Sequence, residues 1–156
     1  MPEYRPADLA PDADERAFVI STWASSYKHS HFAGLIRSED WAAVMHDQLG
    51  KLIDRSTVRT LVAWDPPAFL YGHIVGDTAG ATPIVHYVYV KDPFREAGIA
   101  RGLFAAMGVD PAKPFVYTSR TSMVVRLTDK IPLARFSPAA ARYTKYQESR
   151  HGQRRS

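Results

Sequence analysis

The sequence predicts a mixed α/β fold (α+β) in a single domain, with a central, mostly antiparallel sheet flanked by helices. A chain of 156 residues, 46% of them hydrophobic, is long enough to bury one full core. Apolar residues recur at helical spacing in the first third of the chain and then alternate at the period of strands. A further helix and a further strand follow, which is an order expected of a mixed sheet with helices packed on it.

The first third predicts a short extended segment and two helices. Residues 3–7 are extended and end at a proline turn. Asp14 can cap a helix that runs over residues 15–29. Ser38 can cap the next helix, and acids in its first turn favour the positive end of the helix dipole. An apolar stripe at helical spacing predicts that this second helix continues to Ile53.

The middle of the chain changes to the strand period of two. Strands are predicted over residues 59–65, 68–77, 81–90 and 113–121, with a helix over 98–108 between the last two. In the third of these strands, uninterrupted alternation places His86, Val88 and Val90 on one face.

Charge is distributed unevenly along the chain. Residues 1–112 contain ten Lys or Arg and fourteen Asp or Glu, whereas residues 113–156 contain ten basic and two acidic residues. We divide the chain into a folded domain, residues 1–141, and a basic tail, residues 142–156. Such a tail can attract nucleic acid or another polyanion. No aromatic or recognition-helix pattern accompanies it, so a solvated chain end is favoured over nucleic-acid binding.

Composition excludes several function classes. The chain has no cysteine, which excludes disulfides, thiolate zinc sites and a cysteine nucleophile. Its first residues carry acids and prolines where a signal peptide needs a basic run and then an apolar one. Apolar runs are only a few residues long, far short of a membrane span. We expect a cytoplasmic protein with no membrane partner.

The decapeptide KDPFREAGIA, residues 91–100, joins the third strand to the following helix. A helix N-terminus exposes backbone N–H groups and carries a partial positive charge, so phosphate oxygens bind there readily. Gly98 lets an anion approach the backbone closely, and Arg95 adds a charge and paired donors. The common dinucleotide and nucleotide phosphate-loop patterns do not occur. These residues permit an anion site, although the same residue types also form plain turns.

The decapeptide resembles the acyl-CoA signature of the GNAT superfamily of N-acyltransferases, written R/Q-x-x-G-x-G/A. In this sequence the signature reads Arg95-Glu96-Ala97-Gly98-Ile99-Ala100. The order of elements over residues 3–122 is similar to that of the family as well. The resemblance implies a GNAT-like domain that transfers an acetyl group from acetyl-CoA, the co-substrate, to a primary amine of a small molecule or a protein. It also implies direct attack within a ternary complex.

The resemblance further implies roles for individual residues. Backbone groups of Val88, Tyr89 and Val90 would bind the pantetheine arm. Backbone N–H groups around the start of the helix would hold the pyrophosphate, namely those of Arg95, Glu96, Ala97, Gly98, Ile99, Ala100 and Arg101. Glu96 is expected to have a backbone role only, because a carboxylate repels phosphates.

His86 is the first candidate for the general base that the resemblance implies. In some members of the family the base lies on this strand, and His86 stands nine residues before Arg95. A histidine titrates near neutrality and can accept a proton from an amine. The alternative is a partly buried histidine satisfied by a neighbouring strand, and both interpretations stay open. His73, on the adjacent strand, is interpreted as structural. His29 and His31 have no identifiable third partner, so no metal site is expected.

The last third of the chain departs from the family pattern. Family members usually have a further helix and a β-hairpin there, and a tyrosine commonly protonates the leaving thiolate. Tyr117, Tyr143 and Tyr146 are present, but none falls clearly at the matching place. The end could be shortened, could pair with a second copy in a homodimer, or could mark a protein that binds CoA without ordinary turnover. That CoA-binding protein and a basic nucleic-acid binder remain as alternatives to an N-acetyltransferase.

Overall fold

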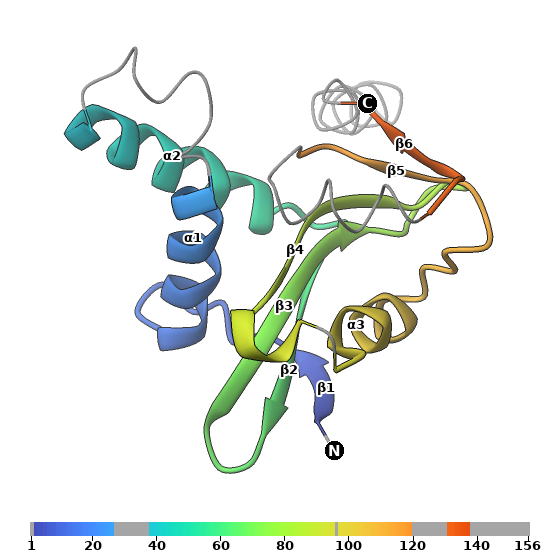
Figure 1. Cartoon of the computed structure of the whole chain (residues 1–156). Coiled ribbons are helices and arrows are strands. Elements are labelled where there is room, and N and C mark those ends of the chain that lie inside the picture. Colours follow the sequence, from blue (N-terminus) through green and yellow to red (C-terminus); the bar gives the residue numbers. More distant parts are fainter. Residues whose placement is uncertain (1, 27–37, 96, 120–130, 138–156) are drawn as a thin grey trace.

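The computed structural model describes residues 2–26, 38–95, 97–119 and 131–137 (Figure 1). Within these ranges it contains six strands, three α-helices and one 3₁₀ turn. In chain order they are β1 (Glu3–Pro6), α1 (Asp14–Ser26), α2 (Ser38–Ile53), β2 (Val58–Asp65), β3 (Phe69–Asp77), β4 (Ile84–Val90), the 3₁₀ turn η2 (Asp92–Phe94), α3 (Ile99–Met107), β5 (Phe115–Tyr117) and β6 (Ala134–Phe136). The predicted order of helices and strands is confirmed, and β6 and η2 are additions to it. The basic tail at residues 142–156 lies outside the described residues.

The six strands form one mixed sheet in the order β1-β2-β3-β4-β5-β6. The pairs from β1 to β4 are antiparallel, whereas β5 runs parallel to β4 and β6 runs parallel to β5. A parallel neighbour requires a crossover connection, and α3 supplies it between β4 and β5. The predicted α/β fold with a mostly antiparallel sheet is therefore confirmed.

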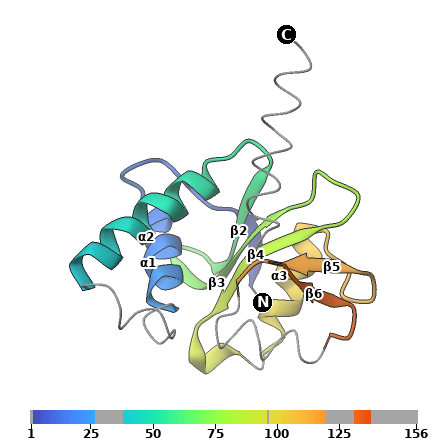
Figure 2. The same ribbon diagram turned by 90° about the horizontal axis from the view of Figure 1, so that it is seen from above.

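The helices cover opposite faces of the sheet. On one face, the indole of Trp23 in α1 stacks on the ring of Tyr87 in β4, with centroids 5.2 Å apart and planes 3° from parallel. On the other face, the ring of Tyr4 in β1 packs directly against the backbone of α3 at Gly102. Figure 2 shows α1 and α2 together on one side of the strands and away from α3. The core thus has two layers of side chains, one on each face of the sheet.

Strand β4 contains a β-bulge at His86. Val75 of β3 lies opposite Tyr87, but the next residue, Gly76, lies opposite Val85. His86 is therefore the extra residue that the bulge inserts between two regular stretches. The uninterrupted alternation predicted for residues 81–90 is wrong at this point, because the bulge reverses the phase of the strand.

Among the described residues, no helix combines the length and the apolar character that crossing a membrane would require.

Candidate cofactor and catalytic site

The backbone groups of β4 point alternately to its two edges, and only one of these edges is paired along the whole strand by a described neighbour. The N–H of Lys91 donates to the carbonyl oxygen of Tyr71 at 2.8 Å, which defines one bonded pair between β4 and β3. Bonded pairs alternate along an antiparallel ladder, so Tyr89 also directs its backbone groups to β3. The N–H and C=O groups of Val88 and Val90 therefore point to the opposite edge of β4.

That opposite edge pairs with β5 only at the beginning of β4. The last register pair is Val85 with Tyr117, after which the N–H of Thr118 donates to the carbonyl of Val85 at 3.1 Å. Beyond this point no described strand pairs with the edge. Figure 1 shows β4 curving toward η2 while β5 runs in another direction. Val88 and Val90 lie along this second part of β4, where the two strands have parted.

The chain then turns from β4 into α3 through η2 and Gly98. Gly98 has φ +79°, a left-handed conformation that L side chains rarely adopt, and no described atom lies within 4 Å of where a Cβ would stand. The first hydrogen bond of the helical ladder runs from the N–H of Gly102 to the carbonyl of Gly98 at 3.0 Å. The N–H groups of residues 99–101 precede this ladder, so they are available at the positive end of the helix dipole.

Helix α3 is held firmly by its buried side. Five of its nine residues are buried: Ile99, Ala100, Leu103, Phe104 and Met107. Phe104 also contacts Phe115 of β5, with ring centroids 5.7 Å apart. Because this side is fixed in the core, the direction of the free N–H groups is fixed as well.

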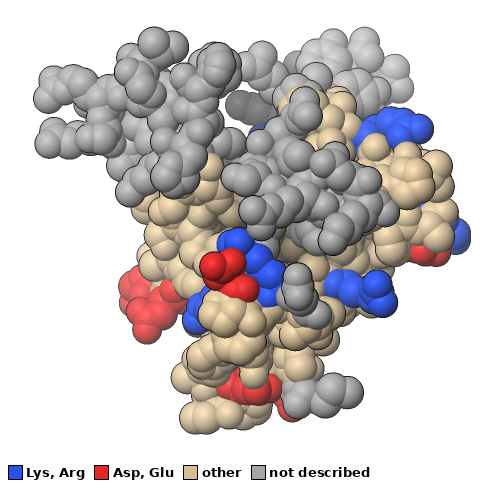
Figure 3. Space-filling view, in the orientation of Figure 1, with Lys and Arg blue, Asp and Glu red and all other residues tan. Residues whose placement is uncertain are grey.

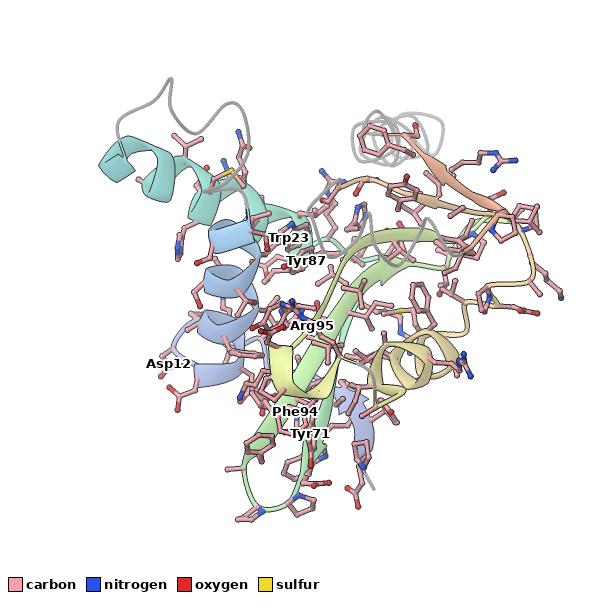
Figure 4. All side chains as sticks on the ribbon, viewed as in Figure 1. Asp12, Trp23, Tyr71, Tyr87, Phe94 and Arg95 are labelled. Atoms are coloured by element: carbon pink, nitrogen blue, oxygen red, sulfur yellow. The ribbon has the colours of Figure 1, made fainter. Side chains whose placement is uncertain are left out.

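The side chain of Arg95 folds back onto the loop. Its Nε donates to the carbonyl oxygen of Val90 at 3.1 Å, and its guanidinium pairs with Asp92 at 3.0 Å. Figure 4 shows Arg95 beside η2, and Figure 3 shows basic and acidic side chains next to one another over this part of the surface. Arg95 therefore ties the end of β4 to the loop, while about one-third of its side chain stays exposed to solvent.

An aromatic cluster made of Phe69, Tyr71 and Phe94 supports the loop from the other side (Figure 4). The three rings meet edge to face with centroids 4.8 to 5.6 Å apart. The ammonium of Lys91 lies 4.7 Å from the centre of the Phe69 ring. These contacts fix η2 against the beginning of β3.

His86 lies at the other end of the open stretch, where β4 and β5 part. It is fully buried, and its Nδ1 is 2.9 Å from the hydroxyl oxygen of Thr118. Its Nε2 has no hydrogen-bond partner among the described residues. The pKa of His86 is lowered to about 4, mainly by burial and also by the charge of Arg55, while the charge of Asp77 acts in the opposite direction. At neutral pH the imidazole is uncharged and carries one nitrogen lone pair.

His73 has a different environment in the core. It is fully buried under α1, and its Nε2 is 2.7 Å from the hydroxyl oxygen of Thr22. Its ring lies 5.6 Å from that of Phe18, edge to face. Burial lowers the pKa of His73 to about 3. These contacts agree with the structural interpretation of this histidine.

The structure gathers most of the predicted cofactor residues around the end of β4. Val88, Val90 and residues 97–101 line the path from the open edge to the helix start, whereas the backbone of Tyr89 faces β3. Glu96 is outside the described residues, as are His29, His31, Tyr143 and Tyr146. Tyr117 lies on β5 with its ring 5.4 Å from that of Phe136.

Thr118 is a residue that the sequence does not mark. It stands 32 positions after His86, in no recognisable pattern with it. Their contact arises only because β5 pairs in parallel with β4. The sequence could have pointed to Thr118 only if this strand pairing and its register had been known.

No family model matches the sequence, and no curated protein matches it. The fold does match solved structures. A protein described as a GNAT-family acetyltransferase from Staphylococcus aureus is 15% identical, with 86% of this chain and 97% of that chain covered and a TM-score of 0.50. A protein described as an acetyltransferase from Pyrococcus furiosus is 19% identical, with 92% and 91% covered and a TM-score of 0.51.

The PaiA N-acetyltransferase from Thermoplasma acidophilum, solved in complex with coenzyme A, is 16% identical, with 94% and 88% covered and a TM-score of 0.49. The chain has the fold of the GNAT acetyltransferases, which confirms the fold that the resemblance implied. A shared fold at these identities does not fix a reaction or a substrate, which depend on the site.

Proposed function

We propose that the chain is an N-acetyltransferase that moves an acetyl group from acetyl-CoA to a primary amine of a small molecule or a protein. The observation that carries this proposal is the open edge of β4, which leads directly to the N-terminus of α3 at the exposed Gly98. An extended strand edge suits the amide groups of pantetheine, and a helix N-terminus suits a pyrophosphate. One continuous segment therefore offers both kinds of group in the order in which they occur in coenzyme A.

In this proposal the backbone does most of the binding. Val88 offers its N–H and C=O groups to the pantetheine arm, and Val90 offers its N–H, because the Val90 carbonyl oxygen already accepts from Arg95. Gly98 and the N–H groups of residues 99–101 bind the pyrophosphate, and the absence of a Cβ at Gly98 lets the phosphate approach. Arg95 acts mainly by holding Val90 and the loop in place. Glu96 contributes a backbone N–H only.

The chemistry follows from placing two reactants in contact. The thioester lies between β4 and β5, where a backbone N–H polarises its carbonyl, and the amine attacks the carbonyl carbon directly. His86 is the proposed base, since its uncharged ring can accept a proton from the amine nitrogen. The amine enters in its neutral form, because the buried imidazole is too weak a base to deprotonate an ordinary ammonium group efficiently.

Binding of the cofactor is tested by thermal unfolding with coenzyme A, acetyl-CoA and ATP. A ligand at one hundred times its Kd stabilises the folded state by about 2.7 kcal/mol, which for a domain of this size raises Tm by about 5–10 °C. We expect this shift with coenzyme A and acetyl-CoA and none with ATP. No shift with either CoA compound would refute the proposal.

Gly98 and Gly108 provide a matched pair of variants for the same measurement. Both have positive φ, +79° and +84°, and neither has a described atom within 4 Å of an added Cβ. Gly98→Ala and Gly108→Ala should each lose about 1–2 kcal/mol of stability from backbone strain. Only Gly98→Ala should also lose the shift with coenzyme A, because Gly108 ends α3 at the far end from the proposed phosphate site. Equal ligand shifts in the two variants would contradict a phosphate site at Gly98.

A further inference from the structure

His86 and Thr118 meet where β4 and β5 part. The N–H of Thr118 is bonded to the carbonyl of Val85, next to His86, so the backbone holds both side chains in one place. The imidazole Nδ1 and the threonine hydroxyl oxygen are 2.9 Å apart, an ordinary hydrogen-bond distance. Because this contact joins two strands, it depends on the fold and not on a local turn.

The second nitrogen of His86 has no partner among the described residues. Five buried side-chain atoms of the described residues have no partner, including Nδ1 of His73, so this alone does not mark a site. Nε2 of His86 differs from that atom of His73 in belonging to a ring at the point where β4 and β5 part. A neutral imidazole has one N–H donor and one lone pair, and the partner of one nitrogen decides which nitrogen holds the proton. The hydroxyl of Thr118 can accept from an N–H at Nδ1 or donate to a lone pair there, and these two arrangements have opposite consequences at Nε2.

We propose that Thr118 is a positioning residue for acetyl transfer, whose hydroxyl accepts a hydrogen bond from Nδ1–H of His86 and leaves the Nε2 lone pair for the acceptor amine. This inference rests on the proposed function. Thr118 touches neither reactant and acts only through the imidazole. The unpartnered Nε2 is then the atom that receives a substrate proton, and it does so through water because the imidazole is fully buried.

The proton balance of the reaction favours this tautomer. The amine nitrogen forms a bond to the thioester carbonyl carbon, and its surplus proton passes to Nε2 of His86. The C–S bond then breaks with its electron pair on sulfur, and the imidazolium returns the proton to the thiolate, so the products are the amide and free CoA. Through both steps Nδ1 keeps its proton and its bond to Thr118, and that bond strengthens while the ring is positively charged. The opposite tautomer has no lone pair at Nε2 and cannot accept the proton there.

Two charged groups near the His86 ring have opposite effects on its protonated form. Arg55 opposes a positive charge on His86, and Asp77 favours one. The carboxylate of Asp77 is itself held by the hydroxyl of Thr57 at 2.8 Å and by the N–H of Ala79 at 3.0 Å. The hydrogen bond that Nδ1–H of His86 donates to the Thr118 hydroxyl persists in the charged state and adds to the support from Asp77.

The tautomer is measured first, by long-range ¹H–¹⁵N NMR of the imidazole rings in the full chain. The His86→Gln variant assigns the His86 signals. We expect the Nδ1–H form for His86 in the wild type and a mixture of the two forms in Thr118→Val, whereas Thr118→Ser should restore the wild-type pattern. His73 is the control ring, and its signals should not change in either variant. An Nε2–H form in the wild type, or no change in Thr118→Val, would overturn the inference.

Kinetics with acetyl-CoA and a panel of primary amines provides the second readout. Thr118→Val should lower kcat about tenfold with KM for acetyl-CoA within about twofold of the wild-type value, and Thr118→Ser should recover most of the rate. A Thr118→Val variant with unchanged kcat would also overturn the inference. If the wild type binds coenzyme A but acetylates no amine, the proposed function fails. The NMR measurement of the His86 tautomer still tests whether Thr118 accepts a hydrogen bond from Nδ1–H.

Discussion

His73 and His86 are two imidazoles that burial holds in the uncharged state. Each has one nitrogen bonded to a threonine hydroxyl and one nitrogen without a partner among the described residues. The pKa of each is lowered, to about 3 for His73 and to about 4 for His86. A neutral ring can be packed in the core at the cost of one unmade hydrogen bond, whereas a charged ring there would cost far more.

The two histidines should make stability fall as the pH is lowered from about 6.5 to 5. An unfolded chain binds a proton at each histidine near pH 6.5, but the folded chain binds it only near pH 3 to 4. Each proton that only the unfolded state holds removes about 1.4 kcal/mol per pH unit. The loss is small above pH 7 and is steepest when both histidines are charged in the unfolded chain. Urea unfolding at several pH values measures this dependence.

The His86→Gln variant isolates one of the two contributions. It should reduce the slope of stability against pH by about half, whatever its stability at pH 7.5. If the variant does not fold, an NMR titration of the wild type answers the same question, since the ring signals of His86 should move by only about a tenth of their full titration shift between pH 7 and 5. Movement by half or more of that shift would show that the ring becomes charged in the folded state and would contradict the prediction.

At the scale of elements, Arg95 connects a strand end to a helix start. Its Nε donates a hydrogen bond to the carbonyl of Val90, so the guanidinium holds the loop in shape in addition to supplying a positive charge. A lysine keeps the charge but lacks the planar group that can reach Val90 and Asp92 at once.

Arg95→Lys and Arg95→Ala should therefore weaken coenzyme A binding by a similar factor, on the order of tenfold. Isothermal titration calorimetry measures the Kd of each. Asp92→Asn is the control, because the Asp92 side chain is 84% exposed and a surface ion pair contributes little, so its Kd should stay within about twofold. Wild-type affinity in Arg95→Lys would mean that the charge alone matters.

The contact between β1 and α3 depends on a glycine. A Cβ on Gly102 would overlap both the hydroxyl and the ring of Tyr4. Gly102→Ala should therefore destabilise the protein by roughly 1–3 kcal/mol, although alanine is the better helix former. In a Tyr4→Ala background the same substitution should become neutral or stabilising. Urea unfolding of the four chains in this double-mutant cycle measures the coupling, and equal costs in both backgrounds would rule out the overlap as the cause.

Across the whole molecule, the sequence predicts the order of elements well and their detailed pairing poorly. The change of period after Ile53 and the glycine before α3 are local signals, and both correspond to observed elements. The bulge at His86 has no local signal, because it exists only relative to the partner strand β3. β6 is three residues long and pairs in parallel, so it has neither the length nor the alternation by which a strand is recognised.

In the candidate site, too, the sequence predicts the contiguous parts and not the contacts between distant residues. The loop and its glycine are contiguous in sequence and could be predicted together, since a strand, a glycine and a helix follow one another there. For α3, helical spacing predicts that Ile99, Leu103, Ala106 and Met107 face inward. Ala106 is exposed and Phe104 is buried instead, so one of these four positions is wrong. The contacts of Arg95 with Val90 and of His86 with Thr118 depend on how backbones are placed in space, which spacing along the chain does not encode.

The strand order of the sheet is the order in which a ribosome would make it. Each described strand from β2 to β6 joins the edge left by the one before, and none has to be inserted between two neighbours that are already paired. A growing chain can therefore extend the sheet in one direction as it is synthesised, without undoing earlier pairs. By the time α3 has been made, β1 to β4 can already be paired. Helix α3, which carries the proposed phosphate site, can therefore pack at once on a sheet that has already formed.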